Sequence, residues 1–376
     1  MKNLIVLLLV FAGDRSSAQA GFTKVIDPAN PVTTFTSSGS YKGAAWVDVD
    51  NDGYVDLFAG QKYLFKNSGG GVFSQMTTVI NAGFLQNPTG SSWADLDNDG
   101  DLDCITSQNP SGVYTNNGAG VFTDISAQIP GFTGFTAWGC AIGDWNKDAF
   151  PDFVFAHALN FPAGYPATPC NIYLNQNNTI IPAQITGYDF TDSIKPYTVP
   201  MWSDYDLDGD MDLFIASGPV YNPGFDYCYK NLKMETGADS LVRLTTPLFA
   251  SQLQDGQCYN FPDIDNDGDF DVCLTNYAQA PSRLYINNSG IYTAAVTPFT
   301  IQGAAHLAND WGDYDNDGDL DVIITNDGAP ASFYKNNGAG VFTLTSATLS
   351  QANNSGVANC DYDNDGDLDL FIHGTG

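Results

Sequence analysis

The segment Asp313-Tyr-Asp-Asn-Asp-Gly-Asp-Leu-Asp321 has Asp at positions 1, 3, 5 and 9 and Gly at position 6. Alternate residues of a tight loop can turn their carboxylates toward one centre, and Gly318 allows the positive φ that folds the loop over. The residue at position 7 can add its backbone carbonyl. Ca²⁺ takes about six to eight oxygen ligands of this kind. Close carboxylates repel each other unless a cation lies between them, so this segment predicts a calcium site.

The same pattern recurs along the chain, with its first Asp at 48, 95, 144, 204, 263, 313 and 361. A period of roughly 50 residues, repeated this often, is typical of an array or a propeller. We therefore expect about six calcium sites in six complete loops, with the position-7 residue contributing its carbonyl. The predicted ligands are Asp48, Asp50, Asp52, Tyr54 and Asp56; Asp95, Asp97, Asp99, Asp101 and Asp103; Asp204, Asp206, Asp208, Asp210 and Asp212; Asp263, Asp265, Asp267, Asp269 and Asp271; Asp313, Asp315, Asp317, Asp319 and Asp321; and Asp361, Asp363, Asp365, Asp367 and Asp369.

The third copy of the loop departs from the pattern. It keeps oxygen-bearing residues at positions 1, 3, 5 and 9, namely Asp144, Asn146, Asp148 and Asp152. Ala149 replaces the Gly, however, and Lys147 adds a positive charge that opposes a cation. This copy predicts a weak or empty site.

Two other interpretations compete with this calcium site. Hairpin turns alone would explain the Asp-Gly pair, but they would not explain four Asp in fixed phase. An EF-hand loop needs an acidic residue at position 12. Position 12 holds Ala59, Thr106, Phe155, Ile215, Leu274, Ile324 and Ile372, none of them acidic. The loops are therefore not EF-hands, and the chain continues from each of them into a strand.

Composition and the N-terminal residues indicate an extracytoplasmic protein. The 43 acidic residues outnumber the 13 basic ones, which gives a formal charge of −30 and argues against a nucleic-acid partner. Residues 1–20 resemble a secretory signal, with Lys2, an apolar run at Leu4–Ala12 and Ala18-Gln-Ala20 as the cleavage site. The apolar run is too short to span a bilayer. We expect a secreted or cell-surface protein with no membrane span.

Seven cysteines occur in the chain. Most lie in apolar segments, where we expect buried small side chains. Cys170 and Cys228 occupy similar places in adjacent repeats and are the best candidates for a disulfide.

Each repeat predicts four short strands. An aromatic residue precedes most loops by two positions, as Trp46 and Trp202 do, and we expect it to pack between blades. An apolar strand follows the loop, for example Leu213–Ala216. The third strand ends in an Asn turn, as in Val113–Asn117, and the fourth begins at Gly-Val-Phe, as in Gly120–Thr123. Four such strands form one antiparallel blade, and repeated blades form a propeller.

The Asp loop, the apolar strand and the Asn-Asn-Gly turn together resemble FG-GAP/VCBS repeats. These are the units of the integrin α-subunit head propeller and of many secreted bacterial proteins. The resemblance covers nearly all of residues 21–376. It implies an all-β, seven-bladed β-propeller of four-stranded antiparallel blades, with a calcium loop between the first two strands of each blade.

The seventh repeat stops after its second strand, at Leu370–Gly376. Gly21–Ile26 resembles a fourth strand, so we expect both ends of the chain to share one incomplete blade, with the N-terminal piece outermost. The missing third strand would come from part of Asp27–Ser40 or from residues beyond Gly376.

No catalytic constellation is evident, since none of the three His has a nucleophile or metal partner at a recognisable spacing. We interpret the chain as a calcium-binding propeller that acts as a glycan-binding, protein-binding or adhesion module, either as a monomer or as part of a longer chain. A propeller-scaffold polysaccharide lyase or hydrolase is the alternative. Repeats three and four carry insertions, so the ligand is expected on the face away from the metals. The candidate ligand-binding residues are Phe161, Tyr165, Tyr221, Phe225 and Tyr277.

Overall fold

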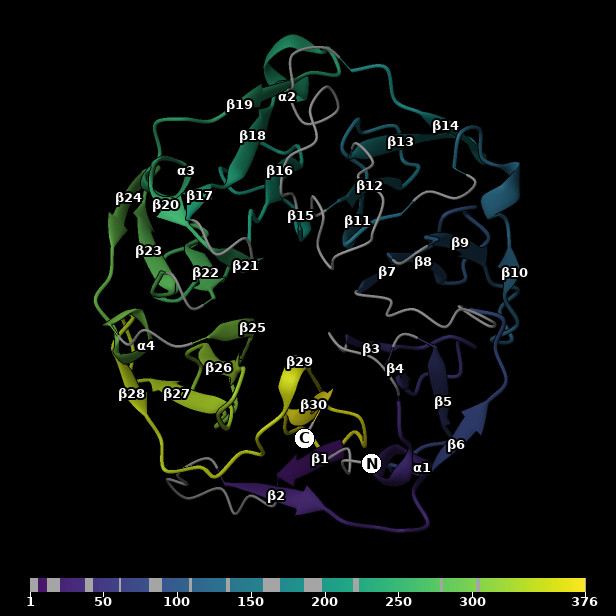
Figure 1. The fold of residues 1–376 in the computed structure, drawn as a ribbon, viewed down its shortest axis with the longest axis vertical. Helices are drawn as coiled ribbons and strands as arrows, with labels where there is room; N and C mark the ends of the chain where they lie inside the picture. Colours follow the sequence, from purple (N-terminus) through teal and green to yellow (C-terminus); the bar gives the residue numbers. More distant parts are fainter. Residues whose placement is uncertain are drawn as a thin grey trace.

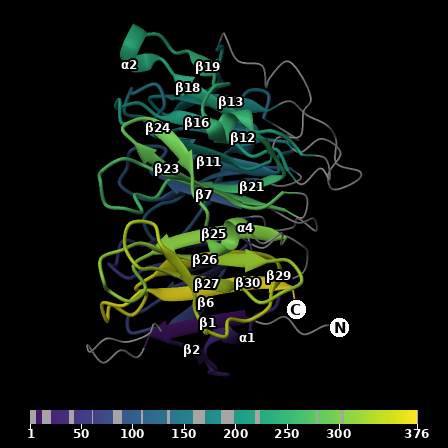
Figure 2. The same cartoon turned by 90° about the vertical axis from the view of Figure 1, so that its left-hand side faces the viewer.

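A computed structural model describes residues 6–11, 21–37, 43–60, 62–80, 90–107, 110–132, 136–157, 170–185, 198–218, 223–277, 280–301 and 305–375. The strands form four-stranded antiparallel sheets arranged in a ring around a central axis (Figure 1). Figure 2 shows the ring edge-on, with the strands running roughly along that axis. The predicted all-β propeller with four-stranded antiparallel blades is therefore confirmed.

Six blades are each built from one continuous stretch of chain. The first contains β3 (Ala44–Val47), β4 (Asp56–Ala59), β5 (Tyr63–Asn67) and β6 (Phe73–Met76). The second contains β7 (Gly90–Ala94), β8 (Asp103–Ser107), β9 (Gly112–Thr115) and β10 (Thr123–Asp124). The third contains β11 (Gly139–Gly143), β12 (Asp152–Ala156), β13 (Asn171–Gln176) and β14 (Thr179–Pro182).

The other three continuous blades follow the same plan. The fourth contains β15 (Pro200–Ser203), β16 (Asp212–Ile215), β18 (Tyr227–Asn231) and β19 (Leu241–Arg243). The fifth contains β21 (Gly256–Asn260), β22 (Val272–Asn276), β23 (Arg283–Asn288) and β24 (Ile291–Ala294). The sixth contains β25 (His306–Gly312), β26 (Asp321–Asn326), β27 (Ser332–Asn336) and β28 (Phe342–Leu344).

The structure therefore has six blades that are each built from continuous chain, not the seven that the resemblance implied, and the remaining four-stranded sheet is composite. Its order is β29 (Asn353–Cys360), β30 (Asp369–Thr375), β1 (Val6–Phe11) and β2 (Phe22–Val25). Both ends of the chain share this sheet and β2 lies outermost, as predicted. The expected source of the third strand is wrong, because β1 fills that place and pairs with β30.

The residues expected to replace the third strand fold differently. Part of Asp27–Ser40 forms the short helix α1 (Pro31–Thr34), whose Val32 is buried against the first blade and the composite sheet. β1 lies within residues 1–20, the segment that the sequence predicts to be a secretory signal. N-terminal sequencing of the protein recovered from cells would show whether this segment is retained.

Short helices and a two-stranded sheet lie outside the four-stranded sheets. The helix α2 (Lys233–Thr236) lies in the enlarged turn between β18 and β19, where the sequence shows an insertion. Three further short helices are η1 (Ser126–Gln128), α3 (Leu248–Ser251) and α4 (Pro298–Ile301). A two-stranded sheet pairs β17 (Gly224–Phe225) with β20 (Leu253–Gln254). Within the described ranges, no helix is long and apolar enough to cross a membrane.

The core lies between neighbouring blades. The second strand of each continuous blade is buried along its whole length, as β16 and β26 are, because both of its faces pack against adjacent blades. The aromatic residues before the loops contribute to these junctions, as predicted. Trp46 stacks on Tyr362 with ring centroids 5.9 Å apart, and Trp202 stacks on Trp145 at 6.3 Å. Aromatic pairs of this geometry add packing energy beyond the area that they bury.

All seven cysteines are free thiols, so the suggested Cys170–Cys228 disulfide is wrong. The two residues belong to different core clusters, one between the third and fourth blades and one between the fourth and fifth. Cys104 and Cys273 are fully buried, which confirms their interpretation as small core side chains.

Candidate metal sites

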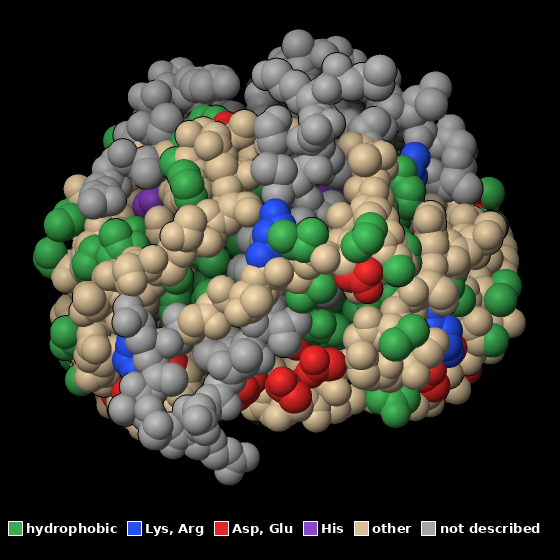
Figure 3. All heavy atoms as spheres, turned by 90° about the horizontal axis from the view of Figure 1, so that it is seen from below, with side chains coloured by type: hydrophobic (Ala, Val, Ile, Leu, Met, Phe, Trp, Pro, Cys, Tyr) green, Lys and Arg blue, Asp and Glu red, His purple; other side chains and the backbone are tan. Residues whose placement is uncertain are grey.

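Each Asp loop connects the first and second strands of its blade, and acidic side chains gather toward one rim of the ring (Figure 3). In the sixth blade, the two oxygens of Asp313 accept hydrogen bonds from the backbone N–H groups of Asp317 and Gly318, at 3.0 and 2.9 Å. Gly318 has φ +95°, as its position in the loop predicts. The position-1 carboxylate therefore closes the loop through the backbone.

The third loop has the same backbone arrangement. Asp144 accepts hydrogen bonds from the backbone N–H groups of Asp148 and Ala149, both at 3.0 Å. Ala149 takes φ +71°, so the missing Gly is accommodated by strain rather than by a different loop. The ammonium group of Lys147 donates to the carbonyl of Gly209 in the next loop.

The position-3 carboxylate distinguishes the six complete loops from the third one. Its Oδ1 atom is buried and makes no hydrogen bond with any described residue in Asp50, Asp97, Asp206, Asp265, Asp315 and Asp363. In the third loop, Asn146 Oδ1 accepts from the N–H of Asp148 at 3.0 Å, and Asn146 Nδ2 donates to Asp148 Oδ2 at 3.1 Å. A buried carboxylate oxygen without a partner is costly unless a cation or proton satisfies it.

The donor sets are also compact enough to share one ion. In the first loop, carboxylate oxygens of Asp48, Asp50 and Asp56 lie within 4.8 Å of one another. Equivalent positions 1, 3 and 9 meet in the fourth and fifth loops, and positions 1, 3 and 5 meet in the second. Hard oxygen donors in this arrangement fit Ca²⁺, which would be held by the residues named above. The donors of the third loop fit it less well, although Asp152 retains an unpartnered Oδ2.

The position-9 Asp lies at the start of each second strand, or directly before it in the fifth blade, and is buried. In the six continuous blades its Oδ1 accepts the backbone N–H of an Asn at or next to the end of the third strand, for example Asn336 to Asp321 at 2.8 Å. Burial raises the pKa of Asp321 to about 7 and that of Asp212 to about 9, since desolvation disfavours the anion. In the composite sheet β1 stands where that Asn would be, and Asp369 Oδ1 makes no hydrogen bond with any described residue.

Three lysines at the loops were not predicted from the sequence. Lys66, Lys230 and Lys335 each form ion pairs with the position-3 and position-5 carboxylates of the loop in their own blade. The sequence feature that could have indicated these lysines is a Lys-Asn pair at the end of the third strand, as in Lys335-Asn336. Glu235 of α2, also missed, extends this contact in the fourth blade by accepting from Lys230 at 2.8 Å.

The lysines change the electrostatics of their loops. Bonding to Lys66 holds the pKa of Asp52 below its ordinary value. Burial works to raise the pKa values of Asp208 and Asp317, but the paired lysines outweigh it and lower them. In three loops where the described residues show no such ion pair, burial and then neighbouring carboxylates raise the pKa of the position-3 Asp. These residues are Asp97, Asp265 and Asp363.

Position 4 links neighbouring loops. Asn51 Nδ2 donates to Asp101 Oδ1 of the next loop at 2.6 Å, and Asn316 Nδ2 donates to Asp367 Oδ1 at 2.7 Å. The link from the fifth loop to the sixth is Asn266 Nδ2 to Asp319 Oδ1 at 3.1 Å. Lys147 serves this purpose in the third loop. The fourth loop has Leu207 at position 4, and its apolar side chain cannot make such a bond.

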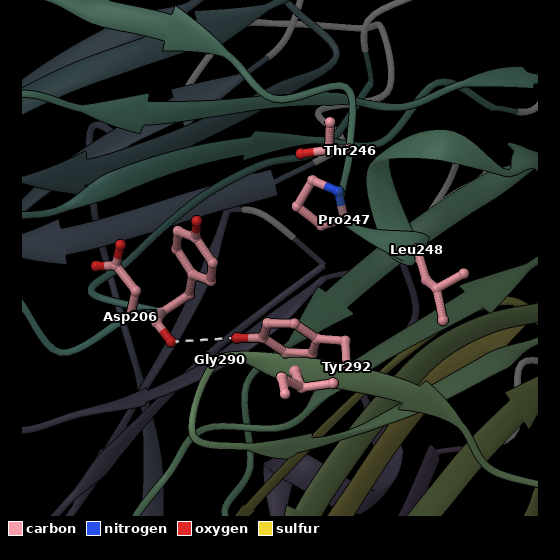
Figure 4. Close-up of a pocket in the computed structure, with 8 residues that line it drawn as sticks. Asp206, Thr246, Pro247, Leu248, Gly290 and Tyr292 are labelled. Carbon is pink, nitrogen blue, oxygen red and sulfur yellow. Dashed lines mark hydrogen bonds between the residues drawn. The ribbon is translucent and has the colours of Figure 1, made fainter.

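A groove lies at the periphery between the fourth and fifth blades. At other junctions, the Asn that ends a third strand donates its Nδ2 to the position-2 carbonyl of the preceding loop, as Asn231 does to Trp145 O at 2.7 Å. In the fifth blade, Asn287 Nδ2 instead donates to the hydroxyl of Tyr292 at 3.2 Å, and that hydroxyl donates to Tyr205 O at 3.4 Å. A pocket of about 480 Å³ opens beside this contact (Figure 4). Its lining comprises Tyr205, Asp206, Thr246, Pro247, Leu248, Gly290, Ile291 and Tyr292.

The predicted ligand-binding aromatics are not shown to form one site. Phe225 lies on β17 and is 50% exposed. The Tyr277 hydroxyl donates to Asp327 Oδ2 at 2.6 Å, so this polar group is already used within the protein. The other three candidates, Phe161, Tyr165 and Tyr221, lie outside the described residues.

A buried polar cluster near the same junction was also missed. Asp226 accepts hydrogen bonds from the hydroxyls of Tyr259 at 2.7 Å and Ser217 at 2.6 Å. Burial raises the pKa of Asp226 to about 6. Because Asp226 and Tyr259 are buried, their contact stabilises the packing of the fourth blade against the fifth.

Comparisons with known proteins bear on the family and the fold. Residues 48–106, 263–324 and 313–372 match the FG-GAP-like repeat family. A search of curated protein sequences gave no match. An Agrocybe aegerita lectin, described as recognising non-reducing terminal N-acetylglucosamine, is similar in structure with a TM-score of 0.59 at 15% identity. The match covers 93% of this chain and 91% of the lectin.

Two other solved structures are similar to the ring. BBS1N in complex with ARL6DN has a TM-score of 0.52 at 11% identity, over 93% of this chain and 95% of that one. An ancestral GH74 enzyme has a TM-score of 0.46 at 11% identity, over 86% of this chain and 39% of that one. Likeness at such identities concerns the fold alone. The three regions that match FG-GAP-like repeats, together with the ring of four-stranded antiparallel sheets, support an FG-GAP repeat β-propeller.

Proposed function

We propose that this protein is a calcium-stabilised β-propeller that binds glycans. The calcium part rests on one observation, the buried Oδ1 atom that lacks a described partner at position 3 of all six complete loops. A bound Ca²⁺ would satisfy this oxygen and cancel the repulsion among the carboxylates around it. The chain's own contribution is to fix those carboxylates through backbone hydrogen bonds before a metal arrives.

The glycan part rests on the groove between the fourth and fifth blades. A volume of about 480 Å³ falls within the range of roughly 300–1,000 Å³ that is common for small-ligand sites. The ring of Tyr292 offers a flat apolar surface, while Thr246 offers a hydroxyl group at the edge. This combination suits a sugar ring, which has an apolar face and hydroxyl groups around it. The similar lectin fold, whose own ligand is a terminal sugar, supports the same class of ligand.

The test is binding to an array of glycans with defined terminal sugars, in calcium chloride and again with chelator. We expect binding in calcium that is lost when Tyr292→Ala removes the aromatic face. Leu248→Trp, which fills the groove, should have the same effect while keeping the Tyr292 contacts. Phe225→Ala is the matched control, since it removes an exposed aromatic ring on β17 without altering the groove.

The outcomes separate the possible sites. Loss of binding in Phe225→Ala with retention in Tyr292→Ala and Leu248→Trp would move the site to the surface around β17. If the folded wild-type protein binds no glycan on the array, the glycan proposal fails and a protein partner takes its place. Thermal melts of each variant in calcium confirm that it is folded before its binding is compared.

A further inference from the structure

We propose that Lys66, Lys230 and Lys335 divide the six complete loops into two classes. Loops with a lysine hold their shape without metal and bind calcium more weakly, whereas loops without one depend on calcium and bind it more tightly. This inference rests on the proposed calcium binding and deepens it, because it assigns residues that set the affinity of each site.

The geometry of the three lysines is the same. Each precedes the Asn that ends the third strand, and its ammonium group lies between two carboxylates of the loop. Nζ to Oδ2 distances are 2.9 Å for Lys66–Asp52, Lys230–Asp208 and Lys335–Asp317. Each lysine also bonds the position-3 Oδ2, of Asp50, Asp206 and Asp315 respectively. The lysine thus occupies one oxygen of the position-3 carboxylate and leaves Oδ1 for a metal.

The other complete loops have a different residue at this place. Thr115 and Ile286 precede the matching Asn in the second and fifth blades, and neither can carry a charge. In the composite sheet, β1 takes the position of the third strand. The described residues show no ion pair to the loops that begin at Asp95, Asp263 and Asp361.

Elementary electrostatics gives the consequence. An ammonium group between two carboxylates removes much of their mutual repulsion, so a lysine loop tolerates the loss of its metal. The same positive charge a few ångströms from a bound cation repels it, which weakens calcium binding by at least about tenfold. Around the ring, lysine loops occupy the first, fourth and sixth blades and are never adjacent. Each metal-dependent loop therefore has at least one lysine loop beside it.

The test combines calcium titration by calorimetry with thermal melts in chelator, using the full chain and calcium chloride alone. The wild-type protein should show two classes of about three sites each. Lys230→Met should move one site from the weak class to the tight class and lower the melting temperature in chelator. Thr115→Lys should do the reverse, moving one site to the weak class and raising the melting temperature in chelator.

Lys233→Met is the matched control. It removes the same charge three residues away, where Lys233 pairs with Asp239 at 2.6 Å in the outer turn and not with a loop. It should leave the number of tight sites unchanged.

Three results would overturn the inference. These are one uniform class of sites in the wild type, an equal loss of stability for Lys230→Met in calcium and in chelator, and a Thr115→Lys variant with unchanged site classes. A wild-type protein that binds no calcium at all would instead remove the proposed function, so the two failures are distinguishable.

Discussion

The loops of the third and sixth blades have the same backbone path and different chemistry. In both, a position-1 Asp binds two backbone N–H groups at 2.9 to 3.0 Å, and a position-9 Asp binds the Asn that ends the third strand. The sixth loop leaves Asp315 Oδ1 without a described partner, whereas the third loop uses its position-3 side chain internally. Positions 1 and 9 therefore fix the shape of both loops, and we propose that position 3 decides whether a loop needs a cation.

The largest expected effect comes from removing calcium. Six loops with an unsatisfied carboxylate oxygen should all lose stability, so chelation should lower the melting temperature by on the order of 10 °C. Differential scanning calorimetry in calcium and in chelator measures this shift, with magnesium as the matched ion. An unchanged melting temperature would mean that the six loops resemble the third one after all.

The second largest effect concerns how stability depends on pH, which should distinguish the third loop from the six complete loops. Burial raises the pKa of Asp271 and Asp321 to about 7 and that of Asp152 and Asp369 to about 8, above the value near 3.8 of an unfolded chain. The folded, calcium-free protein then binds more protons than the unfolded one between these values. Its stability should therefore fall as the pH rises from about 4 to about 8.

Calcium should abolish the part of this pH-dependent loss of stability that comes from the six complete loops, because the bound ion keeps their carboxylates charged. The third loop should keep its share, which is lost progressively between about pH 4 and about pH 8, and Asp152→Asn should remove that remainder. Chemical denaturation at pH 5, 7 and 8.5, with and without calcium, makes the comparison. A stability that rises with pH in chelator would contradict the expected protonation.

The sequence predicted the loops well because their information is local. Four Asp and a Gly within nine residues determine the backbone hydrogen bonds of each loop, and the aromatic that precedes most loops by two positions predicts its packing between blades. The closure of the ring was not predictable in the same way. The partner of β30 is β1, hundreds of residues away in the chain, and its apolar residues read equally well as an export signal.

The lysines and the groove were missed for a related reason. Lys66, Lys230 and Lys335 lie some distance along the chain from the carboxylates they contact, and only the pairing of second and third strands brings them together. The groove lies beside the contact that Tyr292, rather than Asn287, makes with the preceding blade. That substitution of one contact by another is visible only when two blades are seen side by side.

A constructive experiment sharpens the comparison of the two loops. Asn146→Asp with Ala149→Gly gives the third loop the composition of a complete one, so calcium titration should find one additional site. The matched control is Asp315→Asn, which should remove one site from the sixth loop while leaving its backbone intact. A double variant with unchanged stoichiometry would show that position 3 does not decide metal binding.

The smallest expected effect concerns strain alone. Ala149→Gly should stabilise the protein by about 1 kcal/mol, because Ala at φ +71° is strained and Gly is not. The gain should be the same in calcium and in chelator, since Asn146 still closes the loop. Denaturant unfolding in both conditions measures it, and a gain seen only with calcium would show that the loop had begun to bind metal.

The hydrogen bonds from position 4 of one loop to the next imply communication around the rim. Asn51 holds a carboxylate of the second loop, Asn266 one of the sixth and Asn316 one of the seventh, so ordering of one loop favours ordering of its neighbour. Leu207 interrupts the series between the fourth and fifth loops. The position-4 bonds thus form two series, one from the first loop to the fourth and one from the fifth to the seventh: metal occupancy is expected to be cooperative within each series and independent across Leu207.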